Sequence, residues 1–180
     1  MKIKSLVTGG LGFIGSNLVD LLVEEGHEVS VIDDLSTGYA EYAHPQVKYH
    51  TKDIRKYGEI EELFEGMDYV FHLAALPRVE PSIINPMASD SINTQGSLNV
   101  FFAAKEAGVK KVIFSSSSSI YGDVPPKKVC EKLAPNPLSP YGLQKLFGEQ
   151  YLELFHKLYG LDSVSLRYFN VYGNRQPLEG

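Results

Sequence analysis

The chain has 180 residues, of which 43% are hydrophobic and 22% are charged, and this length and composition suit one globular domain with its own core. Its net charge of -5 excludes the basic footprint of a typical nucleic-acid-binding protein, and no apolar run approaches the ~20 residues of a membrane span. A single cysteine, Cys130, excludes an internal disulfide, and no signal-peptide pattern precedes the first predicted strand, so we expect a cytoplasmic protein.

Strands and helices are predicted to alternate along the chain. Short apolar or β-branched runs predict six strands, at residues 3–7, 28–33, 47–50, 68–73, 111–114 and 163–168. Apolar residues at helical spacing predict helices over residues 13–23, 59–64, 89–107 and 141–159. This alternation is typical of a parallel sheet with helices on both faces, so we predict one doubly wound α/β domain of the Rossmann type.

The first predicted strand leads into a glycine-rich turn within residues 7–17, and a helix follows it. Gly10, Gly12 and Gly15 fit the pattern G-x-G-x-x-G, and Gly9 extends it to G-x-x-G-x-x-G. Such glycines let the backbone approach a pyrophosphate, while the helix N-terminus offers free N–H groups. Glycine-rich turns also occur without a ligand, but the place of this one between a strand and a helix favours a dinucleotide site.

An acid ends the second predicted strand. Asp33 lies 18 residues after Gly15, near the ~20 expected of a carboxylate that accepts both ribose hydroxyls of an adenosine. A carboxylate there would repel a 2′-phosphate, so we predict NAD rather than NADP. The alternative is an ordinary acid in the turn of residues 33–38. Asp53, after the third strand, is a candidate for binding adenine or a plain loop acid or helix cap.

Tyr141 and Lys145 are four residues apart at the start of a predicted helix and therefore share one face. A phenol of pKa ~10 becomes a base near neutral pH only when a cation favours the phenolate. Lys145 and an oxidised nicotinamide would supply that charge. Five serines, residues 115–119, follow the fifth strand and fit a donor that holds a substrate oxygen. The alternatives are a helix-surface pair and a low-complexity loop.

Other chemistries have weaker support in the sequence. His72 lies inside an apolar strand, which favours a satisfied core histidine over a metal ligand. Five scattered histidines and one cysteine give no zinc spacing, and no G-x-S-x-G elbow indicates acyl transfer.

Taken together, these motifs resemble the extended short-chain dehydrogenase/reductase family, in its nucleotide-sugar epimerase and dehydratase branch. The resemblance covers essentially the whole chain. The segments that carry it are residues 8–15, 33–38, 53–54, 72–75, 93, 115–117 with 120–122, 139–142 with Lys145, and 166–173.

The resemblance implies a role for each matching residue. Ser117, Tyr141 and Lys145 would form the catalytic triad. The residues expected to bind the cofactor are Gly9, Gly12, Phe13, Ile14, Gly15, Asp33, Asp34, Ser36, Thr37, Gly38, Asp53, Ile54, Leu73, Ala74, Ala75, Asn93, Tyr141, Lys145 and Tyr168. The residues expected to contact the sugar nucleotide are Ser117, Ser118, Ser119 and Asn170.

Branches of the family differ just after the catalytic hydroxyl. The sugar 4,6-dehydratases resemble Thr-Asp-Glu there, and the decarboxylases also keep a glutamate, whereas this chain has Ser118 and Ser119 after Ser117. The resemblance therefore implies an NAD-dependent 4-epimerase of a UDP-hexose or UDP-N-acetylhexosamine. A nucleotide-sugar dehydratase or another NAD-dependent oxidoreductase is the alternative.

The family's remaining strands and its small substrate domain would come after Gly180. We therefore expect residues 1–180 to form an NAD-binding domain that is truncated relative to the family and lacks full activity. The alternative is an NAD-binding module with no turnover of its own. The resemblance also implies a homodimer through the helices near 89–107 and 141–159. Phe101, Phe102 and Phe147 are candidate contacts, although these faces could pack on the sheet instead.

Overall fold

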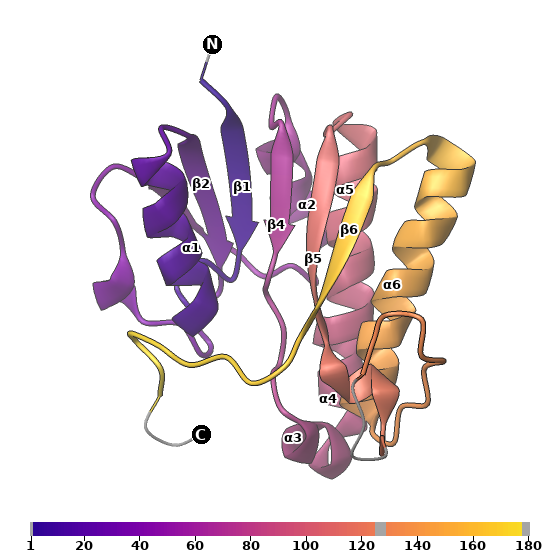
Figure 1. The fold of residues 1–180 in the computed structure, drawn as a ribbon. Coiled ribbons are helices and arrows are strands. Elements are labelled where there is room, and N and C mark those ends of the chain that lie inside the picture. The colour runs from indigo at the N-terminus through magenta and orange to yellow at the C-terminus, as the bar shows by residue number, and fades with distance from the viewer. Residues whose placement is uncertain (1, 125–128, 178–180) are drawn as a thin grey trace.

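The computed structural model describes residues 2–124 and 129–177 (Figure 1). Within them one sheet is formed by β1 (Lys4–Thr8), β2 (Glu28–Asp33), β3 (Lys48–Thr51), β4 (Tyr69–His72), β5 (Lys111–Ser117) and β6 (Ser163–Tyr168). The strand order is β3-β2-β1-β4-β5-β6, and each neighbouring pair is parallel. This arrangement confirms the predicted doubly wound, Rossmann-type sheet.

The helices follow the prediction with three differences. They are α1 (Phe13–Glu24), α2 (Tyr57–Ile60), α3 (Val79–Ile84), α4 (Pro86–Asp90), α5 (Ser97–Glu106) and α6 (Pro140–Tyr159). The first difference concerns the helix predicted over residues 59–64: there an α-helix ends at Ile60 and a 3₁₀ helix, Glu61–Phe64, follows it. A π-helical segment, Ser91–Gly96, joins α4 to α5, so the single helix predicted over residues 89–107 changes its winding midway. The short α3 was not predicted. None of the helices in the described ranges is long and apolar enough to cross a membrane.

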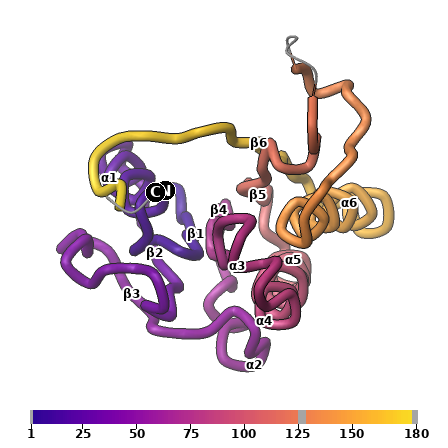
Figure 2. The backbone as a smooth tube through the Cα atoms, turned by 90° about the horizontal axis from the view of Figure 1, so that it is seen from below, coloured from indigo at the N-terminus to yellow at the C-terminus, as the bar shows by residue number. Residues whose placement is uncertain are grey.

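Side chains of neighbouring strand residues pack into separate cores. Leu6 and Val7 follow each other in β1, and successive strand side chains point to opposite faces. Leu6 joins the core under α2, α5 and α6, around Phe64 and Phe101, whereas Val7 packs with Val31 under α1. Figure 2 shows α1 on one side of the sheet and α5 on the other.

The start of α6 is fixed by its own sequence. Ser139 Oγ accepts a hydrogen bond from the Gly142 N–H at 3.1 Å, and Pro140 occupies the first helical position. The helix ends at Gly160, which adopts the left-handed conformation with φ 71°. These signals place Tyr141 and Lys145 in the first two turns of α6, next to the end of β5.

Residues 169–177 leave β6 and cross the carboxyl ends of the strands toward α1, as the yellow segment of Figures 1 and 2 shows. Asn17 Nδ2 donates to the Asn174 carbonyl at 3.0 Å, and Arg175 Nη1 lies 2.8 Å from Asp20 Oδ2. This segment therefore closes one side of the sheet edge that also carries the glycine-rich turn.

Candidate active site

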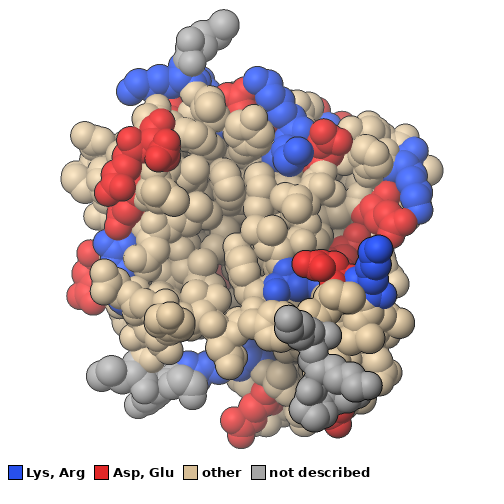
Figure 3. Space-filling view, viewed as in Figure 1, with Lys and Arg blue, Asp and Glu red and all other residues tan. Residues whose placement is uncertain are grey.

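A cleft of about 960 Å³ runs along the carboxyl edge of the sheet. From β3 to β6, the strand order places at this edge Asp53, Asp33, the turn of residues 9–15, Ala74, Ser117 and Tyr168. Figure 3 shows that the face drawn in Figure 1 is largely uncharged at its centre, with charged side chains near its border. Residues far apart in the sequence therefore meet in one continuous cleft.

Most of the predicted site residues line this cleft. Those that do are Gly9, Gly12, Phe13, Ile14, Gly15, Asp33, Asp34, Ser36, Thr37, Asp53, Ile54, Leu73, Ala74, Ala75, Ser117, Ser119, Tyr141, Lys145, Tyr168 and Asn170. Among the described residues, the structure places three predicted ones outside the lining: Gly38, Asn93 and Ser118.

Two glycines at the turn between β1 and α1, Gly9 and Gly15, have no room for a side chain. Gly9 has φ +73°, and a Cβ added to it would lie 2.7 Å from the Ala74 nitrogen. A Cβ on Gly15 would lie 2.0 Å from the Gly9 carbonyl oxygen. The backbone thus approaches the cleft closely, and the N-terminus of α1 opens onto it through Gly12 and Phe13.

Asp33 is held at the floor of the cleft by the backbone. Its Oδ2 accepts from the Leu11 N–H and its Oδ1 from the Leu35 N–H, both at 2.9 Å. Burial raises the pKa of Asp33, and these two N–H groups oppose that rise. Gly38 lies against this carboxylate, since a Cβ there would sit 2.8 Å from Asp33 Oδ1. Gly38 therefore leaves room for Asp33 instead of lining the cleft.

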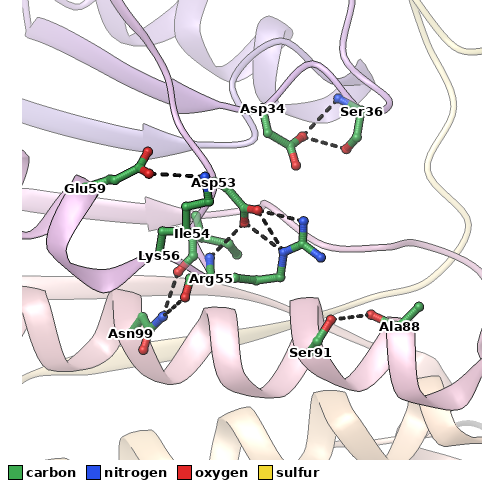
Figure 4. A network of polar contacts seen from close by, with 10 residues as sticks. All are labelled: Asp34, Ser36, Asp53, Ile54, Arg55, Lys56, Glu59, Ala88, Ser91 and Asn99. Atoms are coloured by element: carbon green, nitrogen blue, oxygen red, sulfur yellow. Dashed lines mark hydrogen bonds and ion pairs between the residues drawn. The ribbon is translucent and has the colours of Figure 1, made fainter.

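Acidic side chains mark the end of the cleft near β3 (Figure 4). Asp34 Oδ1 accepts from both the N–H and the hydroxyl of Ser36, at 2.9 and 2.6 Å. Asp53 forms an ion pair with Arg55, with 2.6 Å between Oδ2 and Nη2, and the hydrogen bond from Arg55 lowers the pKa of Asp53. Asn99 on α5 donates to the carbonyl of Ile54 at 2.9 Å and so fixes this loop.

Ser117, Tyr141 and Lys145 meet at the other end of the cleft. The side chains of Tyr141 and Ser117 lie close enough for the Ser117 hydroxyl to lower the pKa of the Tyr141 phenol. Lys145 is only 4% exposed, and its Nζ donates to the Ser115 carbonyl at 2.8 Å and lies 5.8 Å from the centre of the Tyr141 ring. Burial lowers the pKa of Lys145 to about 8. The structure thus brings the three predicted catalytic residues together.

The electrostatics of Tyr141 differ from the sequence-based expectation. Burial raises the pKa of its phenol, and only the hydrogen bond with Ser117 opposes this rise. Lys145 directs its ammonium group at a carbonyl of β5 and not at the phenol. Burial and the orientation of Lys145 therefore favour the neutral phenol of Tyr141.

The remaining predicted residues divide between the cleft and its support. Tyr168 is hydrogen-bonded to the side chain of Ser115 at the cleft wall, and Asn170 is exposed at its open side. Ser118 lies in the 3₁₀ turn after β5, while the N–H of Ser119 donates to Ser117 Oγ at 3.1 Å. Ser119 therefore orients the Ser117 hydroxyl from behind.

Asn93 lies outside the cleft lining and holds two segments together by hydrogen bonds. Its Oδ1 accepts from the Leu76 N–H at 2.8 Å, and its Nδ2 donates to the Leu76 carbonyl at 3.1 Å and to Gln144 Oε1 at 2.9 Å. The amide is thus occupied within the protein. It joins the loop after β4 to α6 and so positions residues that line the cleft.

Some lining residues carried no motif in the sequence. Lys52 directly follows β3, Arg78 lies in the loop after β4 with φ 80°, and Gln176 belongs to the segment that crosses toward α1. The available signal for the first two was position alone, because loops at the carboxyl ends of parallel strands form the ligand site of such sheets.

A doubly wound parallel sheet with a glycine-rich first turn, and with a tyrosine and a lysine beside a serine at its carboxyl edge, defines a Rossmann-type dinucleotide-binding domain. The chain belongs to the NAD dependent epimerase/dehydratase family, whose profile matches residues 5–180.

Individual relatives agree with this assignment. The chain is 40% identical over 177 residues to a putative UDP-glucose 4-epimerase of Methanocaldococcus jannaschii, a match that covers 97% of this chain and 58% of that protein. It is 44% identical, with a TM-score of 0.94, to the UDP-N-acetylglucosamine 4-epimerase from Methanobrevibacter ruminantium M1, solved with UDP-N-acetylmuramic acid; 100% of this chain and 59% of that one are covered.

A third similar protein is the UDP-glucose 4-epimerase of Thermus thermophilus, solved as a complex with NAD. It is 40% identical, with a TM-score of 0.94 and coverage of 97% of this chain and 58% of that one. The chain therefore spans somewhat more than half the length of the proteins it matches. These findings confirm the predicted family and NAD as the cofactor of that family.

Proposed function

We propose that this chain binds NAD⁺ and provides the catalytic residues for the 4-epimerisation of a UDP-sugar. The observation that carries the proposal is the meeting of the glycine turn, Asp33 and the Ser117–Tyr141 pair in one cleft. The names of the relatives support the sugar chemistry, since the three that we compared are called UDP-glucose or UDP-N-acetylglucosamine 4-epimerases.

The shape of the cleft fits an extended dinucleotide. Strands in a sheet are about 4.8 Å apart, so the distance from β3 to β6 is roughly 24 Å. Along it, Asp53 would face adenine, Asp33 the adenosine ribose, and the backbone at Gly9 and Gly15 the pyrophosphate. Lys145 would lie at the nicotinamide ribose. Because no side chain fits at Gly9 or Gly15, a phosphate group can come close to the backbone there.

The chain's own residues would then move one proton. NAD⁺, held by the glycine turn and Asp33, would supply a reversible hydride acceptor for C4 of the sugar, and the 4-keto sugar would have to turn over in the cleft between the two transfers. Tyr141, as the phenolate, takes the proton of the sugar 4-hydroxyl while Ser117 holds the same oxygen. Lys145 Nζ, 5.8 Å from the centre of the Tyr141 ring, would add positive charge at longer range, and an oxidised nicotinamide would add the charge that the phenolate lacks. Tyr141 returns the proton when the hydride returns, so the configuration at C4 changes without net oxidation.

Serines at positions 118 and 119 favour epimerisation over water elimination. Elimination needs an acid and a base beside the catalytic hydroxyl, and neither serine can act as one near neutral pH. Asn170 at the open side of the cleft and Ser119 behind Ser117 would contact or orient the sugar nucleotide.

A second candidate function is NAD binding without turnover, because the glycine turn and Asp33 form a dinucleotide site by themselves. Proton NMR of the chain with NAD⁺ and UDP-glucose or UDP-N-acetylglucosamine separates the two. We expect the 4-epimer to form, and we expect Tyr141→Phe to slow it by about 10²- to 10⁴-fold. A 4-keto-6-deoxy product would indicate a dehydratase, and accumulating NADH a dehydrogenase. NAD⁺ binding with no product would support the second function.

Calorimetric titration with NAD⁺ tests the cofactor site by itself. Hydrogen bonds to a charged group contribute about 1.5–3 kcal/mol, so Asp33→Ala should weaken binding by roughly 10- to 150-fold. Glu25→Gln is the matched control, because Glu25 is exposed at the far end of α1. Failure of the folded wild-type chain to bind NAD⁺, or equal binding by Asp33→Ala, would contradict the assignment.

We also propose that two copies of the chain associate through α5 and α6. An exposed apolar stripe runs along α6, from Leu143 (55% exposed) through Phe147 and Leu154 to Leu158 (60% exposed). Phe102 is exposed on the neighbouring α5. Phe101 was expected to contribute, but it is 0% exposed and packs in the core against His72 and Phe114.

A further inference from the structure

Glu149 and Arg167 form a polar cluster behind the wall of the cleft. Arg167 Nη2 donates to Glu149 Oε2 at 2.7 Å, and Arg167 Nε donates to Oε1 at 3.0 Å. Ser116 Oγ donates to the same Oε1 at 2.5 Å. The side chains of Arg167 and Glu149 are only 19% and 12% exposed, so this is a largely buried, two-pronged ion pair.

The cluster joins the two elements that carry the candidate catalytic residues, α6 and β5, to β6, which carries the cleft-lining Tyr168. Glu149 lies on α6, Ser116 on β5 and Arg167 on β6. Each has a catalytic or cleft-lining neighbour. Glu149 is one helical turn beyond Lys145, Ser116 directly precedes Ser117, and Arg167 directly precedes Tyr168.

The donors of Arg167 are used within the protein. Its Nη1 donates to the Tyr121 hydroxyl at 2.9 Å and to the Glu131 carbonyl at 3.1 Å, and its guanidinium lies 4.9 Å from the centre of the Tyr121 ring. Neither Glu149 nor Arg167 is among the described residues that line the 960 Å³ cleft. The pair instead lines a separate cavity of about 340 Å³, so it can influence the 960 Å³ cleft only through its neighbours.

We propose that Glu149 is a positioning residue, which fixes α6 against β5 and β6 and thereby sets the geometry between Tyr141, Ser117 and Lys145. The inference rests on the proposed function. Its physical basis is that a displacement of about 1 Å at a reacting group can cost on the order of 10²-fold in rate. The stability of the fold alone does not explain why this pair is present, because a buried ion pair gives little net stability compared with apolar residues of similar size.

Glu149→Gln is the sharpest variant. A glutamine keeps the size of the side chain and an acceptor for Ser116 but removes the charge that holds Arg167. Glu153→Gln is the matched control, one turn further along α6, where Glu153 pairs with Lys157 in solvent at 2.6 Å. Glu149→Asp is the second variant. Aspartate keeps the negative charge, so this variant can be used if Glu149→Gln fails to fold.

Two measurements on the full chain test the inference. In the NMR assay, Glu149→Gln should lower kcat by about 10²-fold with KM and NAD⁺ affinity within a few-fold of wild type. Glu149→Asp should give a smaller loss, and Glu153→Gln none. Unchanged kcat in Glu149→Gln, or a loss that tracks falling NAD⁺ affinity and unfolding, would overturn the inference.

The second measurement does not depend on turnover. Phenolate absorbance, titrated with pH and corrected by the matching Tyr141→Phe variant, isolates Tyr141. The hydrogen bond with Ser117 lowers the pKa of Tyr141, so a displaced α6 should raise that pKa in Glu149→Gln but not in Glu153→Gln. Identical titrations of Tyr141 would show that Glu149 does not set this geometry, even if the chain epimerises nothing.

Discussion

The ring of His72 lies between Thr8 and Ser97, and the surrounding hydrogen bonds fix its protons. Ser97 Oγ donates to the Asn93 carbonyl at 2.6 Å, so it accepts from His72 Nε2 at 2.9 Å. Thr8 Oγ1 accepts from the Ala74 N–H and donates to Nδ1 at 2.7 Å. His72 is thus neutral and fully hydrogen-bonded, which confirms the prediction of a satisfied core histidine.

The buried, neutral His72 should make the chain less stable at mildly acidic pH. Burial lowers the pKa of His72 to about 3, whereas the unfolded chain has an ordinary histidine near ~6.5. The unfolded state therefore binds more protons between these values. Stability is fully present above the unfolded pKa and is lost as pH falls toward the folded pKa, by at most about 1.4 kcal/mol per pH unit.

Urea unfolding at several pH values between 7 and ~4 measures this effect. His72→Gln should be less stable at pH 7 but should lose less stability on acidification than wild type. His156→Gln is the comparison variant, because the His156 side chain is 59% exposed on α6. Parallel slopes for wild type and His72→Gln would refute the assignment of the acid sensitivity to His72.

At the scale of single residues, the sequence predicted position better than orientation. Asp33, Tyr141 and Lys145 could be predicted because strand ends and helical spacing determine where they lie. Asn93 and Gly38 could not, because their roles depend on contacts with Leu76 and with the Asp33 carboxylate, which come from other parts of the chain. A motif predicts that a residue lies at the site, but it does not predict the direction in which the side chain points.

Among the elements, α1 requires a glycine at one position inside the helix, Gly15, where glycine is normally unfavourable. Glycine inside a helix normally costs about 1 kcal/mol relative to alanine. At Gly15, however, an added Cβ would lie 2.0 Å from the Gly9 carbonyl oxygen, which is backbone and cannot rotate away. The first turn of α1 must therefore move before any side chain fits.

We expect Gly15→Ala to destabilise the chain by about 1–3 kcal/mol or more and to abolish measurable NAD⁺ binding. Gly58→Ala on α2 is the matched control, since the nearest atom to its added Cβ is the flexible Glu61 Oε1 at 3.9 Å. Gly58→Ala should be neutral or stabilising by up to about 1 kcal/mol. Urea midpoints of both variants measure the contrast, and equal midpoints would contradict the steric argument.

The elements were predictable where local pattern and burial agree. Residues 28–33 and 163–168 form β2 and β6 with the predicted bounds. β5 is longer than predicted, because Ser115 to Ser117 continue the strand and pair with Leu166 to Tyr168 on β6. Because these serines are polar, the sequence did not predict that the strand continues through them to the candidate catalytic Ser117. The short α3, which contains Pro81, depends on packing against α6 that no local window reveals.

At the scale of the whole molecule, the order of the strands in the sheet determines where each proposed ligand contact lies along the cleft. The strand order β3-β2-β1-β4-β5-β6 reverses at β1, so residues near 9, 33 and 53 lie to one side and residues near 117 and 168 to the other. The proposed adenosine and sugar ends of the ligand are thereby separated along one edge. None of the α6 stripe residues Leu143, Phe147, Leu154 and Leu158 lines the cleft, which makes association of two chains separable from cofactor binding.

Association through α5 and α6 predicts a dimer in solution. The stripe members Phe147, Leu154 and Leu158 lie on one helical face, and an exposed apolar stripe of this kind marks an interaction surface. Leu154→Arg places an unpaired charge at its centre and should give monomers that still bind NAD⁺. Leu21→Arg, at an exposed leucine of α1, should remain dimeric. Light scattering at matched concentrations measures the molecular mass of each variant in solution. A monomeric wild-type chain or a dimeric Leu154→Arg would exclude this surface as the interface.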